Sequence, residues 1–233
     1  MSGPYKSIPR CHFCQNPPPQ GGFFYALIHF TARKNYGILN ELLNSQQYAA
    51  LPHAHKGVTA MIRIVTDSAA DLTAAELNVP GIFVVPLSVT FADGTTQLDD
   101  GTMTKDEFFV RLAEDSKLPR TSQPSPASFM QVYEDAAAAG DEVLVITIGQ
   151  KLSGTYQCAH LAAADVGLQV HIVDSEAASQ AEALLVREAV RLRDEEGLTA
   201  EEIAAVLEQF KKRVRIVAVV DSLKHLQKGG RLP

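Results

Sequence analysis

Short apolar runs that end in polar turns recur from Met61 onward, and this feature constrains the fold more than any other. The runs cover residues 62–65, 83–91, 143–148, 170–173 and 214–220. Helix-like segments separate the later runs, which is typical of parallel strands joined by helical crossovers. The pattern therefore predicts an α/β fold with a mostly parallel sheet flanked by helices.

Polar residues mark where the connecting helices begin. Two pairs have the spacing of a capping box, Thr104 with Glu107 and Thr199 with Glu202. Each pair predicts a helix that starts after its threonine, the second reaching about residue 212. A further helix is predicted over residues 181–193, and the turn at 92–95 predicts a hairpin with a short return strand.

Polar side chains follow the apolar runs at the point where each predicted strand ends. These groups are Asp67-Ser68, the segment 149–153, Asp174-Ser175 and Asp221-Ser222. In open α/β sheets the binding crevice lies outside the carboxyl ends of the strands. The spacing therefore predicts a single ligand-binding edge.

Residues 1–60 differ in composition from the rest of the chain. They hold four of the seven histidines, two of the three cysteines and a run of three prolines. We expect a poorly ordered extension here, with Met61 as the natural start and a genuine extension as the alternative. The sequence Cys11-His12-Phe13-Cys14 has metal-like spacing, but no second cysteine pair accompanies it.

Charge and hydropathy exclude several partners. The whole chain has a net charge of −6. Residues 1–60 carry five Lys or Arg and one Glu, a net charge of +4, so the remaining residues carry a net charge of −10. This acidic body argues against nucleic acid and against a polybasic membrane anchor. No apolar run reaches the roughly 18 residues of a membrane span. Three cysteines do not form a disulfide framework, so a cytoplasmic location is predicted.

The first candidate site is a hydroxyl-rich segment before a helix. Ser125 can cap this helix and Pro126 can fill its first position. Thr121 and Ser122 would then lie in a loop that runs into the helix start. A capped helix with no ligand is the alternative.

The second candidate site is Leu152-Ser153-Gly154-Thr155, between a predicted strand and a helix. Ser153 supplies a hydroxyl, Gly154 allows close approach of the backbone, and the helix start supplies free N–H groups. The segment lacks the Gly-Lys-Ser/Thr ending of a Walker loop. Two such segments at one crevice would hold a carboxylate or phosphate without a metal or cofactor; a purely structural turn is the alternative.

The sequence gives less support to a catalytic function. The chain has no G-x-S-x-G elbow for a nucleophilic serine. His171 falls within a predicted strand and His160 on a predicted helix face, so neither is an obvious base. Asp67 and Asp71 could form a Mg²⁺ pair, but their spacing also suits turn and capping roles.

The motifs, taken together and in order, resemble the DegV family of proteins over residues 61–233. They are Ile64-Val65-Thr66-Asp67-Ser68-Ala69-Ala70-Asp71-Leu72, Val85-Pro86-Leu87, Asp93-Gly94, Thr121-Ser122-Gln123-Pro124-Ser125-Pro126, Leu152-Ser153-Gly154-Thr155-Tyr156-Gln157, Val173-Asp174-Ser175 and Leu226-Gln227-Lys228-Gly229-Gly230-Arg231.

The resemblance implies a two-domain protein that binds one long-chain fatty acid and presents its carboxylate to a separate kinase subunit. It implies no catalysis by this chain. The head-group contacts carried over by motif are Thr121, Ser122 and Ser153, with Gly154 in support. Asp67 and Ser68 would line the same edge. Removing a C16 tail from water contributes about 0.8 kcal/mol per methylene, on the order of 12 kcal/mol in all. A carrier must therefore enclose the tail in an apolar tunnel.

The resemblance also implies where this chain departs from the family. We expect a DegV-like N-terminal domain over 61–195 and, over 196–233, the start of a second α/β domain that is incomplete at Pro233. The alternatives are a phosphoryl-transfer enzyme similar to dihydroxyacetone kinase and a fragment without function.

Overall fold

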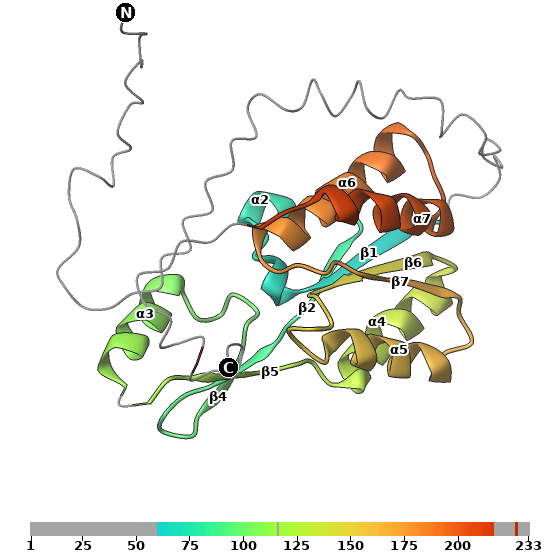
Figure 1. Cartoon of the computed structure of the whole chain (residues 1–233). Helices are drawn as coiled ribbons and strands as arrows, with labels where there is room; N and C mark the ends of the chain where they lie inside the picture. Colours follow the sequence, from blue (N-terminus) through green and yellow to red (C-terminus); the bar gives the residue numbers. More distant parts are fainter. Residues whose placement is uncertain (1–59, 116, 217–226, 228–233) are drawn as a thin grey trace, which may run out of the picture.

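A four-stranded parallel sheet forms the centre of the computed structural model, which describes residues 60–115, 117–216 and 227. Its strands run in the order β2-β1-β6-β7 (Figure 1). Their bounds are β1 (Ile62–Asp67), β2 (Ile82–Val85), β6 (Glu142–Thr147) and β7 (Val170–Asp174). Every pairing between them is parallel. The predicted parallel sheet is thus confirmed.

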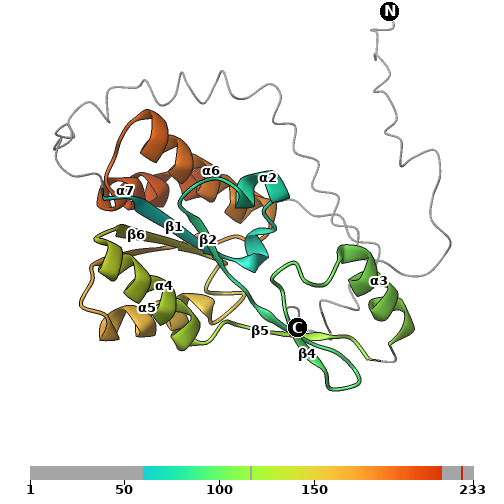
Figure 2. The same ribbon diagram turned by 180° about the vertical axis from the view of Figure 1, so that it is seen from behind.

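Helices cover both faces of this sheet, as predicted. On one face lie α6 (Gln180–Glu195) and α7 (Ala200–Phe210), and on the other lie α4 (Pro126–Ala139) and α5 (Thr155–Asp165) (Figures 1 and 2). Because successive side chains of a strand point to opposite faces, each strand serves two cores. Ile64 packs into the core beneath α6 and α7, and Val65 packs into the core beneath α4 and α5.

A small antiparallel sheet extends beyond the end of β2 and carries α3 (Lys105–Glu114) beside it (Figure 1). Its strands, in the order β4-β3-β5, are β3 (Ser88–Thr90), β4 (Thr96–Leu98) and β5 (Arg120–Ser122). The hairpin predicted at residues 92–95 joins β3 to β4, with Gly94 at φ +85°.

The apolar run 83–91 was expected to be one strand, and that prediction is wrong. The run divides into β2, which ends at Val85, and β3, which begins at Ser88 and belongs to the other sheet. Pro86 lies at the break. Since proline has no N–H to donate to a strand ladder, the chain leaves the first sheet there.

Side-chain caps fix the helix starts that the capping boxes predicted. Thr104 accepts from the Glu107 N–H at 3.2 Å and Thr199 from the Glu202 N–H at 3.3 Å. A third box starts the short helix α2 (Ala74–Leu77) at Thr73. After α7 the chain makes one 3₁₀ turn (Lys211–Arg213).

The helix after residue 195 shares the core of the first domain. Ile203 and Leu207 of α7 are fully buried together with Leu185 of α6 and Leu144 of β6. The predicted division of the chain at residues 195 and 196 stays a prediction, but the described residues place α7 against β6 and β7.

Several predictions fall on residues outside the described ranges. They concern residues 1–59 of the predicted extension, the Cys11–Cys14 motif, Asp221-Ser222, and residues 217–226 and 228–233 of the predicted second domain. Of the strand predicted at 214–220, residues 214–216 are described and form no strand. Within the described part of the chain, no helix is long and apolar enough to cross a bilayer.

Candidate functional site

A pocket of about 590 Å³ lies where the two sheets meet, at the carboxyl edge of the parallel sheet. Its lining residues are Leu87, Thr121, Ser122, Gln123, Ile148, Leu152, Ser153 and Gly154. The volume is in the range of roughly 300–1,000 Å³ that small-molecule sites occupy. Both predicted hydroxyl segments therefore reach one pocket, although some thirty residues separate them in sequence.

Four of the eight lining residues had no predicted role in binding the head group. Leu87, Ile148 and Leu152 form an apolar part of the wall, and Gln123 adds a neutral amide beside the hydroxyls. The described lining contains no charged side chain. Leu87 and Gln123 stood inside the quoted motifs, but nothing in their spacing showed that they face the same space.

Thr121 and Ser122 lie in strand β5, so the prediction that they occupy a loop is wrong. Thr121 pairs with Val89 and Ser122 with Ser88. The partner strand lies about thirty residues earlier, which is why no local pattern revealed it. In a strand the two side chains point to opposite faces, and Thr121 shares the face of buried Val89.

The two helix starts near the pocket differ in their caps. Ser125 accepts a hydrogen bond from the Ser128 N–H at 3.2 Å, so the start of α4 is capped from within. Gly154 is the N-cap of α5 and offers no side chain to that helix. Ser153 Oγ lies 2.9 Å from the Thr155 hydroxyl. The Thr155 N–H donates to Ser153 Oγ at 3.4 Å. Helix α5 nevertheless lacks the N-cap side chain that α4 has, and its start carries a partial positive charge.

Asp67 and Ser68 lie behind the pocket wall and hold it in place. Asp67 Oδ2 accepts from the Ile148 N–H at 2.8 Å, and its Oδ1 accepts from the Ala69 N–H at 3.0 Å. Ser68 Oγ accepts from the Leu87 N–H at 3.1 Å. These two residues, expected to line the crevice, thus position two of its lining residues instead. The turn and capping role of Asp67 is confirmed.

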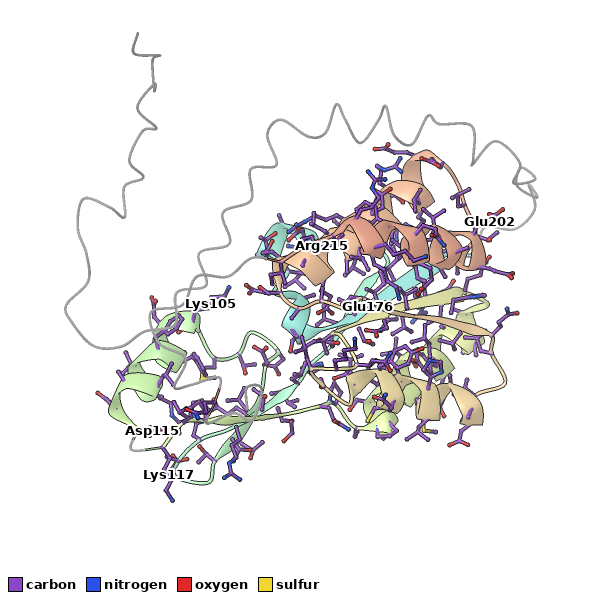
Figure 3. All side chains as sticks on the ribbon, in the orientation of Figure 1. Lys105, Asp115, Lys117, Glu176, Glu202 and Arg215 are labelled. Atoms are coloured by element: carbon purple, nitrogen blue, oxygen red, sulfur yellow. The ribbon has the colours of Figure 1, made fainter. Side chains whose placement is uncertain are left out.

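The end of β7 holds the same pocket segment from the other side. Asp174 Oδ1 accepts from the Gln150 N–H at 3.1 Å and from the Glu176 N–H at 3.0 Å. Gly149 donates its N–H to the Ala177 carbonyl at 2.7 Å. Figure 3 labels Glu176 at this turn. Residues 148–154 are thereby attached to the ends of both strands that flank β6.

Lys211 joins α7 to the same turn. Its ammonium donates to the Asp174 carbonyl at 3.0 Å and lies 3.2 Å from the Glu176 carboxylate. Its side chain is only 8% exposed. The turn after β7 is therefore fixed both by the pocket segment and by the helix layer above it.

Buried carboxyl groups gather beneath this edge. Burial raises the pKa of Asp67 to about 6, against the opposing effect of the N–H groups of Ile148 and Ala69. Burial also raises the pKa of Glu182 on α6 well above its ordinary value, and the nearby charges of Asp67 and Asp174 act in the same direction. One Glu182 oxygen accepts from the Thr66 hydroxyl at 3.1 Å, and the other has no partner among the described residues.

Glu182→Gln is expected to stabilise the protein more as the pH rises. A carboxyl whose pKa is raised in the folded state contributes stability below its unfolded value, near 4.5, and loses it as the pH increases through the folded value. Glutamine does not titrate, so its advantage should grow above pH 4.5. Urea denaturation of both proteins between pH 5 and 8 measures this.

The exposed Glu201→Gln on α7 is the matched control, because it removes the same charge outside the core. A Glu182→Gln advantage that does not grow with pH would contradict a raised pKa of the buried Glu182 carboxyl.

Comparison with known proteins gives consistent matches. The model of the DegV family, described as an uncharacterised protein family, matches residues 61–233. A DegV domain-containing protein of Caldanaerobacter subterraneus is 38% identical over 172 residues, covering 73% of this chain and 60% of that protein. The chain thus spans about 60% of the length of the curated relatives it matches.

Solved structures agree with this match. A fatty-acid-binding DegV family protein from Thermus thermophilus is 38% identical with a TM-score of 0.65, covering 74% of this chain and 61% of that one. The Streptococcus pneumoniae Fatty Acid Kinase B3 protein, loaded with linoleic acid, is 25% identical with a TM-score of 0.58. That match covers 65% of this chain and 54% of the Streptococcus protein.

Proposed function

Because this chain belongs to the DegV family, we propose that it binds one long-chain fatty acid and holds the carboxylate in the pocket at the sheet edge. The observation that carries the proposal is the meeting of Thr121, Ser122 and Ser153 with the start of α5 in one pocket. The fatty acids bound by the Thermus and Streptococcus proteins support it.

In this proposal the ligand carboxylate is bound by uncharged hydrogen-bond donors. Hydroxyl groups of Thr121 or Ser122 and of Ser153 donate to the carboxylate oxygens, and the first N–H groups of α5 add their partial charge. Gly154 lets the head group approach the backbone at the helix start. The alkyl chain then leaves along Leu87, Ile148 and Leu152, the apolar part of the lining.

In this proposal the bound fatty acid is made available to a separate enzyme. The chain presents the carboxylate to a kinase subunit and does not itself catalyse the reaction. The name of the Streptococcus protein, a component of fatty acid kinase, supports this partner. The alternative of a phosphoryl-transfer enzyme calls for a substrate-binding histidine, and the two described histidines, His160 on α5 and His171 on β7, do not line the pocket.

Oleate is expected to raise the midpoint of thermal unfolding by roughly 5–10 °C at a free concentration about one hundred times its Kd. A ligand that binds only the folded state then adds about 2.7 kcal/mol, and each kcal/mol shifts a protein of this size by about 2–4 °C. The measurement is a thermal melt of the 233-residue chain with and without oleate.

Native mass spectrometry of the protein purified from bacteria gives an independent readout, with a bound C16–C18 acid as the expected result. A protein that is empty or carries a nucleotide, and that melts at the same temperature with and without oleate, would contradict the proposal.

A further inference from the structure

Gln123 is an exposed residue of the pocket wall whose side chain is hydrogen-bonded to a neighbouring helix. Its Nε2 donates to Cys158 Sγ at 3.1 Å, which ties the end of β5 to the body of α5. Cys158 itself is buried, with 6% of its surface exposed. A long, flexible side chain is therefore held at one end by a group from the helix that bears the anion site.

Gly154 makes room for this amide. A Cβ atom placed on Gly154 would lie 2.3 Å from Gln123 Oε1 and 2.9 Å from Nε2, distances that real Cβ atoms do not adopt. The backbone of Gly154 has an ordinary φ of −79°, so conformation alone does not require glycine there. The end of the flexible Gln123 side chain lies against this N-cap residue of α5, so it must shift if a side chain is added to Gly154.

The amide is therefore placed at the predicted position of the ligand head group. It lines the pocket beside Ser153 and Gly154, and it is uncharged at every physiological pH. The Nε2 amino group has two N–H donors, and among the described residues only one of them has a partner, Cys158 Sγ. The second N–H can donate to an ionised carboxylate, which accepts hydrogen bonds but donates none.

We propose that Gln123 contacts the ligand head group and determines which head-group charge the pocket accepts, with Gly154 and Cys158 as the residues that position it. This inference rests on the proposed function, and it names the residue that discriminates between charged and uncharged head groups. A carboxylate at this exposed position would repel an ionised fatty acid, because two like charges at contact distance repel each other even where water partly screens them.

The test compares palmitate with hexadecan-1-ol, an uncharged ligand of the same chain length, on the 233-residue chain. Gln123→Glu is expected to weaken palmitate binding at least about tenfold through charge repulsion and to leave hexadecan-1-ol within about twofold of the wild type. Gly154→Ala, which displaces the amide, should lower palmitate affinity without this charge selectivity.

Two controls separate contact from general effects. Gln209→Glu adds the same charge at an exposed position of α7, on the opposite face of the sheet from α5 and outside the pocket lining. It should change the ratio of the two affinities by less than about twofold, since distant exposed charges are screened. Thr96→Ala, which removes a hydroxyl of β4 outside the pocket lining, is the second control and should retain wild-type affinity for both ligands.

The outcomes distinguish this inference from the function on which it rests. A wild-type protein that binds neither ligand contradicts the proposed function. A wild-type protein that binds palmitate, combined with a Gln123→Glu variant that binds it equally well, overturns the role of Gln123. Equal loss of both ligands in Gln123→Glu also overturns it, because a purely structural wall would not discriminate charge.

Discussion

Gly149→Ala is expected to lower the free energy of unfolding by about 1–3 kcal/mol and to weaken fatty-acid binding. A Cβ atom at this position would lie 3.1 Å from the Ala177 nitrogen and 3.1 Å from the Glu176 carbonyl carbon. Both are backbone atoms. They cannot rotate away as a side chain can, because Asp174 and Lys211 hold the turn that contains them.

The strain should appear in the pocket because Gly149 begins the segment that carries Ser153 and Gly154. Moving this segment away from the turn weakens the hydrogen bonds from Gly149 to Ala177 and from Gln150 to Asp174. Urea denaturation gives the stability change, and oleate titration of the folded protein gives the change in Kd.

Gly167→Ala is the matched control. No atom lies within 4 Å of the Cβ that this change would add, and Gly167 has no positive φ. Its stability should stay within about 0.5 kcal/mol of the wild type or rise slightly, because alanine restricts the unfolded chain. If the two alanine variants behave alike, close packing at Gly149 is not what fixes the pocket segment.

The double variant Thr121→Val with Ser153→Ala is expected to lose roughly one hundredfold to ten-thousandfold in affinity for oleate. Hydrogen bonds to a charged group contribute about 1.5–3 kcal/mol each, so two of them account for about 3–6 kcal/mol, at about 1.4 kcal/mol per tenfold. Valine preserves the branched shape that suits strand β5, so the change removes the hydroxyl and little else.

Stability should fall little in this variant, since Thr121 is exposed and the Ser153 hydroxyl bonds only within its own turn. Thr96→Ala removes a hydroxyl from the far strand of the small sheet and should leave affinity unchanged. Ser122→Ala should cost less than Thr121→Val, because Ser122 points to the opposite face of β5. Isothermal titration measures each Kd; a double variant that binds oleate as the wild type does would place the head group elsewhere.

Local chemistry explains which parts of the fold could be predicted. The capping boxes at Thr104 and Thr199 act within four residues, and the apolar runs of the parallel strands are continuous in sequence. Such signals need no knowledge of distant partners. The start of α4 at Ser125 and Pro126 was predictable for the same reason.

The features that sequence reasoning missed all depend on distant contacts. β5 is a strand only because β3 pairs with it, and the run 83–91 divides because its two halves join different sheets. Asp67 was expected at the crevice because polar residues follow β1. Its two oxygens are instead engaged by backbone N–H groups, one of them donated by Ile148 from another strand's end.

The candidate site shows the same division. Thr121, Ser122, Ser153 and Gly154 could be named from motifs, whereas Leu87 and Gln123 join them only because the two sheets meet there. Which of these residues contacts a ligand stays a prediction for the variants above to test.

The segment 148–154 contributes to the pocket lining but is anchored by the turn after β7, so the lining residues are synthesised before the residues that hold them in place. Every described lining residue has left the ribosome once Gly154 has emerged. The segment gains its anchors later, when Asp174 and Ala177 follow, and that turn is secured only when Lys211 arrives with α7. A nascent chain therefore carries all of its described binding groups before it can hold them in place. The pocket segment therefore has all of its described anchors only after α7 and Lys211 have been synthesised.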